Sequence, residues 1–199
     1  MAIGIIGAGG IGMAFATQLV RAGEDVILSN SRGPASLADA VKKLGPRARA
    51  GTREDAARAP IVALAVQWQQ LDAALADLPP WDGRILIDTT NPVLMPEFRM
   101  ADLGGRSSSE VVASKTPGSR LVKTANNFTP DLLAADPAQA GGHRVLFMSG
   151  DDVAAKKQVS GLLEKAGFAI VDLGSLAIGS RLQQFPGGVT PGLNLLKLG

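Results

Sequence analysis

The chain has 199 residues, 46% of them hydrophobic and 19% charged, which is typical of one globular domain. Its 20 basic residues nearly balance 18 acidic residues, so nucleic acid is not indicated as a partner. The longest apolar runs, such as residues 61–66, are too short to span a membrane, and the absence of cysteine excludes thiolate chemistry and cysteine zinc sites.

The N-terminal segment carries the most informative pattern. An apolar run over residues 2–6 leads directly into G-x-G-x-x-G, and apolar residues at helical spacing continue as far as Gly23. Residues 25–29 predict a second strand. This order predicts a dinucleotide-binding βαβ unit, whose pyrophosphate lies on the helix N-terminus. We expect the pyrophosphate to be bound by the glycine turn, formed by Gly7, Ala8, Gly9, Gly10, Ile11 and Gly12.

The residues after the second strand indicate which dinucleotide is bound. A protein selective for NAD usually has an acidic residue there, which bonds the ribose 2′-hydroxyl. This chain has Asn30, Ser31 and Arg32 instead. Serine and arginine can donate to a 2′-phosphate, and no carboxylate repels it, so we expect NADP as the cofactor. The alternative is that Arg32 is a solvated loop residue.

The rest of the chain continues to alternate between helices and strands, which predicts an α/β fold with a doubly wound (Rossmann), mostly parallel sheet of about eight strands. We expect one domain over residues 1–199. Helices are predicted at residues 35–44 and 69–78 and from Asp152 to Gly167, and three more are predicted to begin at the N-cap residues Thr52, Ser107 and Thr129. Strands are predicted at residues 48–50, 61–66, 84–88, 121–125, 145–149 and 168–173.

The ends of the chain carry two further predictions. The apolar run at the N-terminus has no basic leader and forms the first strand, so we interpret it as part of the fold and expect a cytoplasmic location. The C-terminal tail, residues 173–199, has apolar residues without a helix or strand pattern that would bury them. We therefore expect this tail to form the contact of a homodimer.

Further candidate cofactor residues follow the predicted strands, at the sheet edge where ligands bind. Val66, Gln67 and Trp68 follow the fourth strand, Asn91 and Pro92 follow the fifth, and Asn126 follows the sixth. We expect Trp68 to wall the cofactor crevice and Asn126 to bond a carboxamide or a flavin-like ring edge. Core packing of Trp68 and ordinary turn chemistry of the other residues are the alternatives.

Missing residue types restrict the chemistry. The chain has no tyrosine, which excludes the Tyr-x-x-x-Lys arrangement of short-chain dehydrogenases. Its single histidine, His143, is predicted to enter a strand from the N-terminal edge, away from the cofactor. We therefore expect no catalytic side chain and no metal site. A flavin-like ring accepts hydride directly, so the protein only has to stack two rings in a dry crevice.

The glycine turn, residues 30–34, residues 88–92 and residues 121–128 together resemble the deazaflavin-dependent NADP oxidoreductase family. The reductase domain of membrane metalloreductases has the same pattern. The resemblance implies transfer of hydride between NADPH and a flavin-like coenzyme, either coenzyme F420 or a flavin, as small-molecule partners. Two alternatives stay open: an NADPH-dependent dehydrogenase or reductase of a small carbonyl or imine, and a non-catalytic NADPH-binding protein.

Overall fold

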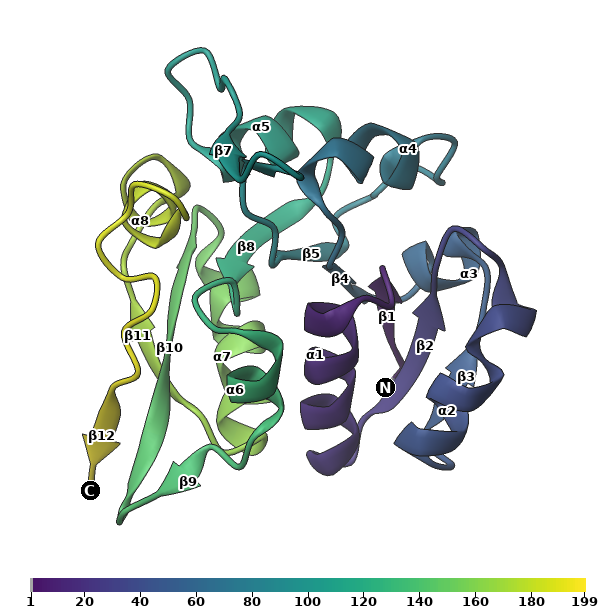
Figure 1. Ribbon diagram of the computed structural model, residues 1–199, viewed down its shortest axis with the longest axis horizontal. Coiled ribbons are helices and arrows are strands. Elements are labelled where there is room, and N and C mark those ends of the chain that lie inside the picture. Colours follow the sequence, from purple (N-terminus) through teal and green to yellow (C-terminus); the bar gives the residue numbers. More distant parts are fainter. Residues whose placement is uncertain (1) are drawn as a thin grey trace.

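Eight strands form the continuous path of the central sheet in the computed structural model, which describes residues 2–199 (Figure 1). The spatial order is β11-β10-β8-β5-β4-β1-β2-β3. The bounds are β1 Ala2–Ile6, β2 Asp25–Ser29, β3 Ala48–Ala50, β4 Ile61–Leu64, β5 Ile85–Asp88, β8 Arg120–Thr124, β10 Gly142–Gly150 and β11 Ala169–Asp172. The predicted α/β Rossmann class and strand number are confirmed.

The strands from β3 to β8 pair in parallel, but β10 runs antiparallel to β8, and β11 is parallel to β10. Consequently β10 starts on the side of the sheet where β8 ends. The prediction that His143 enters its strand from the edge opposite the cofactor is therefore wrong, because it assumed a strand parallel to the others.

Two layers of helices cover the sheet, because alternate residues of each strand face opposite sides. On one side Ile5 packs in a cluster with Phe15, and on the other Val62 packs with Ala56 and Leu71. The first layer contains α1 (Gly10–Arg21), α2 (Ala38–Leu44), α6 (Pro130–Ala134) and α7 (Val153–Lys165); the second contains α3 (Arg53–Ala57), α4 (Leu71–Leu75), α5 (Ser108–Lys115) and α8 (Leu176–Gln183).

Predicted N-caps begin several of these helices. The side chain of Thr52 accepts a hydrogen bond from the N–H of Asp55, and Ser107 accepts one from Glu110, with a reciprocal bond in both cases. The Asp152 side chain caps α7 through the N–H of Ala155. Thr129 occupies the N-cap position of α6 but makes no capping bond with its side chain.

Short elements complete the fold, and two of them lie where the sequence predicts the start of a longer helix. Two 3₁₀ helices, η1 (Pro34–Leu37) and η2 (Trp68–Gln70), precede α2 and α4. The hairpin β6 (Val93–Leu94) and β7 (Arg99–Met100) follows β5. β9 (Ala138–Gln139) and β12 (Leu196–Leu198) pair with the start of β10.

The tail is more regular than predicted. Residues 176–183 form α8, whose buried residues are Leu176, Gly179, Ser180 and Gln183. The prediction that this segment lacks a helical pattern is wrong, because its buried face is mostly small or polar and hydrogen bonds hold it to the sheet. Exposed apolar side chains nevertheless occur here, including Ile178 and Val189.

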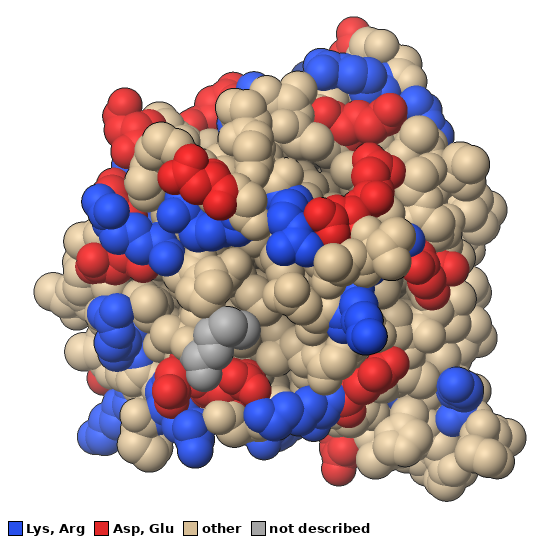
Figure 2. Space-filling model, turned by 180° about the vertical axis from the view of Figure 1, so that it is seen from behind, with Lys and Arg blue, Asp and Glu red and all other residues tan. Residues whose placement is uncertain are grey.

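The outer surface shows two further properties. None of the helices in residues 2–199 is long and apolar enough to cross a membrane. On the face seen in Figure 2, basic and acidic side chains lie interspersed and do not gather by sign.

Candidate functional site

The three glycines of the G-x-G-x-x-G pattern have different surroundings at the end of β1. Gly7 has a φ of 108°, and a Cβ atom there would lie 2.2 Å from the Ala65 carbonyl oxygen. A Cβ atom at Gly12 would lie 1.8 Å from the Gly7 oxygen, whereas one at Gly9 would meet nothing within 4 Å. Gly7 and Gly12 are thus required by packing, and Gly9 faces open space.

The N-terminus of α1 carries no cap from a side chain. Gly9 is the N-cap residue, and the first turn, which includes Gly10, Ile11 and Gly12, contains no acidic residue. The first N–H groups of a helix have no partner within the helix, and its dipole favours a negative charge beside them. This end of α1 therefore suits an anion such as a pyrophosphate.

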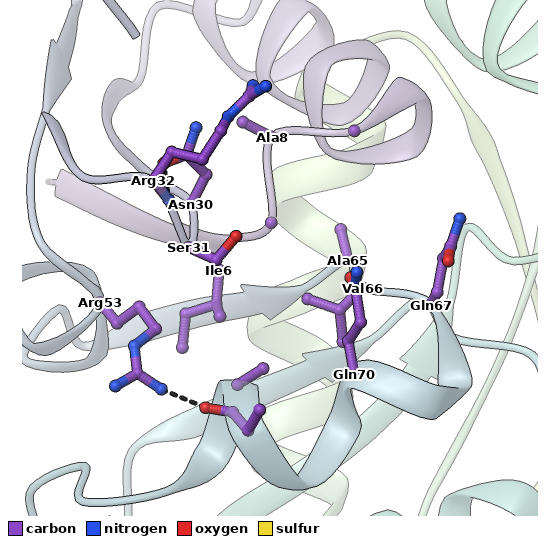
Figure 3. A pocket seen from close by; sticks show the side chains of 14 residues that line it. Ile6, Ala8, Asn30, Ser31, Arg32, Arg53, Ala65, Val66, Gln67 and Gln70 are labelled. Carbon is purple, nitrogen blue, oxygen red and sulfur yellow. Dashed lines mark hydrogen bonds between the residues drawn. The ribbon is translucent and has the colours of Figure 1, made fainter. Parts of the chain in front are cut away.

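A cavity of about 670 Å³ opens beside this glycine turn (Figure 3), within the size range of small-molecule and cofactor sites. It brings together predicted residues from the ends of three strands: Gly7, Ala8, Gly9, Asn30, Ser31, Arg32, Val66 and Gln67. Its remaining lining residues were not predicted: Ile6, Arg53, Ala65, Gln70, Ala73 and Ala74. No carboxylate is among these lining residues.

The segment after β2 is ordered by its own side chains. The Asn30 Oδ1 accepts a hydrogen bond of 2.9 Å from the backbone N–H of Arg32, and the Asn30 amide donates to the Ser36 hydroxyl at 2.9 Å. Such a turn exposes the side chains of Ser31 and Arg32 at the cavity. Among residues 2–199, the Arg32 guanidinium has no hydrogen-bond or ion-pair partner, so its donors are available to a ligand.

Trp68 does not line this cavity. It lines a second cavity of about 320 Å³, together with charged residues of α4, α5 and the loop before α5. The strand predicted over residues 61–66 ends at Leu64, and Trp68 begins η2. The strand thus ends two residues earlier than predicted, and Trp68 does not wall the larger cavity as expected.

Asn91 and Asn126 also lie outside the larger cavity, but they join the ends of β5 and β8. The Asn91 amide donates to the Asn126 backbone oxygen, and the Asn126 amide donates to Asn91 Oδ1, both at 2.9 Å. Asn91 Oδ1 also accepts from the N–H of Phe185 in the tail. Pro92 follows Asn91 in the same turn. Contact of Asn91, Pro92 and Asn126 with a nicotinamide stays a prediction.

A buried ion pair underlies this turn and was not predicted. Asp88 at the end of β5 and Lys123 in β8 lie opposite each other in the sheet and are completely buried. Asp88 Oδ1 accepts from the N–H and hydroxyl of Thr90, and Lys123 donates to the Thr90 carbonyl oxygen. Burial lowers the pKa of Lys123, while the Asp88 charge opposes this effect.

His143 lies at the start of β10, where its Nδ1 is 2.8 Å from the Gly167 carbonyl oxygen. It is not among the lining residues of either cavity described above. Although its predicted edge is wrong, its position gives it no contact with the candidate site.

Comparison with known proteins agrees with this geometry. The model of the family "NADP oxidoreductase coenzyme F420-dependent" matches residues 2–92, which include the glycine turn, the Asn30–Arg32 segment and the turn after β5. This part of the chain is similar to that family. The resemblance indicated by the sequence motifs is confirmed, and both the family description and a solved structural neighbour name NADP-dependent oxidoreductases.

Individual relatives extend the likeness to most of the length of this chain. Metalloreductase STEAP3 of Rattus norvegicus is 30% identical over 92% of this chain, which spans only 36% of that relative. A hypothetical protein, SMa0349 of Sinorhizobium meliloti, is 42% identical with a TM-score of 0.93 over 99% of this chain and 96% of its own. A candidate F420-dependent NADP-reductase of Arthrobacter sp. FB24 is 27% identical, with a TM-score of 0.74 over 87% and 84%.

Proposed function

We propose that this protein is an NADP-dependent oxidoreductase that transfers hydride between NADPH and a flavin-like coenzyme, either coenzyme F420 or a flavin. One observation carries the proposal. The uncapped N-terminus of α1 and the unpaired guanidinium of Arg32 line one cavity that contains no carboxylate. A pyrophosphate at the helix end and a phosphate on the adenosine ribose would complement these two groups.

The residues that line the cavity fit the adenosine and pyrophosphate parts of NADP. Gly9 leaves room beside the helix N-terminus, and Ser31 and Arg32 would bind the 2′-phosphate. Val66 and Gln67, at the far side of the glycine turn, would contact the nicotinamide half, with Asn91 and Asn126 farther along the same sheet edge. When bound, NADPH supplies the hydride, and the protein orients it and excludes water.

The acceptor is proposed on chemical grounds. No histidine or tyrosine lines the cavity, so a carbonyl substrate would have no evident side chain to protonate its oxygen. A flavin or deazaflavin ring needs no such acid. The family description and the Arthrobacter structure, both of which name F420, support this class of acceptor.

Parallel assays of NADPH oxidation test this proposal. The purified protein is incubated with NADPH and coenzyme F420, FMN, FAD, a simple ketone, a cyclic imine or no acceptor, and the loss of NADPH absorbance is followed. We expect turnover with F420 or a flavin and unchanged turnover in His143→Ala. Turnover with only the ketone or imine would favour a dehydrogenase or imine reductase, and binding without turnover would indicate an NADPH-binding protein.

We also propose that the chain acts as a homodimer, in one domain and in the cytoplasm. The exposed apolar side chains of the tail support the dimer: Ile178 is 66% exposed, Val189 70% and Leu198 68%. Light scattering at micromolar concentration measures the mass in solution. A monodisperse species with the mass of one chain would contradict the dimer.

A further inference from the structure

The larger cavity contains a second arginine that the sequence motifs do not indicate. Arg53 begins α3 and follows β3 through Gly51 and the N-cap Thr52. The N–H of Gly51 donates to the Leu28 oxygen of β2 at 2.9 Å, and the capping box of Thr52 fixes the first turn of α3. The backbone of Arg53 is thus anchored beside the end of β2, next to the segment that carries Arg32.

The side chain of Arg53 crosses from α3 to α4. Its Nη1 donates to the backbone oxygen of Ala73 (Figure 3, dashed line). Ala73 belongs to the last turn of α4, whose carbonyl groups lack partners within the helix and favour a cation. The nearest carboxylate is Glu54, 3.7 Å from Nη2. This tie holds the planar guanidinium at the wall of the cavity.

The guanidinium shares its cavity with several apolar residues. Ile6, Ala73 and Ala74 line this cavity together with Arg53, and the lining contains no acidic residue. A guanidinium plane held among apolar side chains suits the face of a flat heteroaromatic ring, through stacking and cation–π attraction. Arg53 comes from the segment after β3, on the β2 and β3 side of the glycine turn, whereas Val66 and Gln67 follow β4 on the other side.

We propose that Arg53 determines cofactor affinity by stacking on the adenine base, while Arg32 binds the 2′-phosphate. The inference rests on the proposed use of NADP. It assigns the two arginines different partners on the same half of the cofactor: Arg53 recognises the base, which NADPH and NADH share, and Arg32 recognises the phosphate, which NADH lacks.

Titrations with three ligands test this division of roles. Dissociation constants of NADPH, NADH and reduced nicotinamide mononucleotide, which has no adenosine, are measured for the unmodified protein and for Arg53→Ala. We expect Arg53→Ala to weaken NADPH and NADH by a similar factor of about ten and to leave the mononucleotide unchanged. Arg53→Lys keeps the charge but loses the plane, so we expect it to recover only a minor part of this loss.

Controls separate base stacking from loss of the tie between α3 and α4. Arg49→Ala removes an exposed arginine of β3 that does not line the cavity and should change no affinity. Weaker binding of the mononucleotide by Arg53→Ala, or a loss confined to NADPH, would overturn the proposal, as would unchanged affinities. If the unmodified protein binds neither dinucleotide, the proposed function itself fails, and that result is visible before any variant is made.

Discussion

The ammonium nitrogen of Lys123 lies 3.2 Å from Asp88 Oδ2, and neither side chain is accessible to solvent. The two residues are direct partners in the register of β5 and β8. Asp88 Oδ2 also accepts from the Ser109 hydroxyl at 2.7 Å, and both members of the pair bond Thr90. The ion pair therefore links the sheet to α5 and to the turn that carries Asn91.

Removing one member of this pair should destabilise the fold strongly. Lys123→Met leaves the Asp88 carboxylate buried without its cation, and a broken buried pair typically costs about 3–5 kcal/mol. We expect a loss of this size in the free energy of unfolding, measured in urea. The double variant Asp88→Asn with Lys123→Met should lose less than the sum of the single variants. Additive effects, or a stable Lys123→Met variant, would show that the pair is not coupled.

Alanine substitutions at Gly9 and Gly12 should have different effects. Gly9→Ala places a methyl group in open space, so its melting temperature should match that of the unmodified protein, whereas its NADPH affinity should fall because the methyl occupies the place of the pyrophosphate. Gly12→Ala forces an atom against the Gly7 backbone and should lower the melting temperature. Calorimetry with and without NADPH measures both effects. An unchanged affinity in Gly9→Ala would contradict the assigned phosphate site.

Arg32→Ala should narrow the preference for NADPH over NADH. A hydrogen bond to a charged group contributes about 1.5–3 kcal/mol, or about tenfold or more in affinity, and only NADPH offers the 2′-phosphate. Titration of both cofactors at one salt concentration gives the ratio. Equal affinities in the unmodified protein would contradict selection by the segment after β2.

The Arg120–Asp152 pair should make stability depend on acid pH. The Arg120 guanidinium, at 2.8 and 2.9 Å, and the N–H of Ala155 hold the pKa of Asp152 well below its ordinary value of 3.8. A carboxyl group whose pKa is lowered by folding stabilises the fold at pH values above its ordinary pKa. This stabilisation is lost as the pH falls through the lowered pKa. Asp152→Asn keeps an oxygen for the cap but has no charge.

We therefore expect the difference in unfolding free energy between the unmodified protein and Asp152→Asn to be largest near neutral pH and to shrink in acid. Urea unfolding at several pH values measures it. A difference that stays constant across this range would mean that the ionised carboxylate contributes nothing.

Local patterns predicted the parts of the fold that local contacts determine. The strand at 25–29 and the N-caps Thr52, Ser107 and Asp152 agree with the structure, because apolar runs and capping residues act within a few residues. The location of the glycine turn and of Asn30–Arg32 at one site could be predicted in the same way, because the βαβ unit brings them together within one short segment.

Contacts between distant segments could not be predicted from the sequence. Lys123 meets Asp88 only through the register of two strands 35 residues apart, and Arg53 reaches Ala73 only because α3 and α4 share one face of the sheet. The direction of β10 is likewise set by pairing with β8 and not by its own sequence. The α8 helix was missed because its buried positions include Ser180 and Gln183, which give no apolar stripe.

The hydrogen bonds between α8 and its neighbours affect how α8 unfolds locally. Gln183 accepts from the Ser149 hydroxyl and donates to the Phe147 oxygen, and the Ser180 hydroxyl donates to Ser107, so side-chain hydrogen bonds hold the helix where apolar contact is small. Water can replace such bonds when the helix detaches, and little apolar surface becomes hydrated. We expect α8 to open as a local unit with a small heat-capacity change, and its amides to exchange hydrogen ahead of those of β1 and β4.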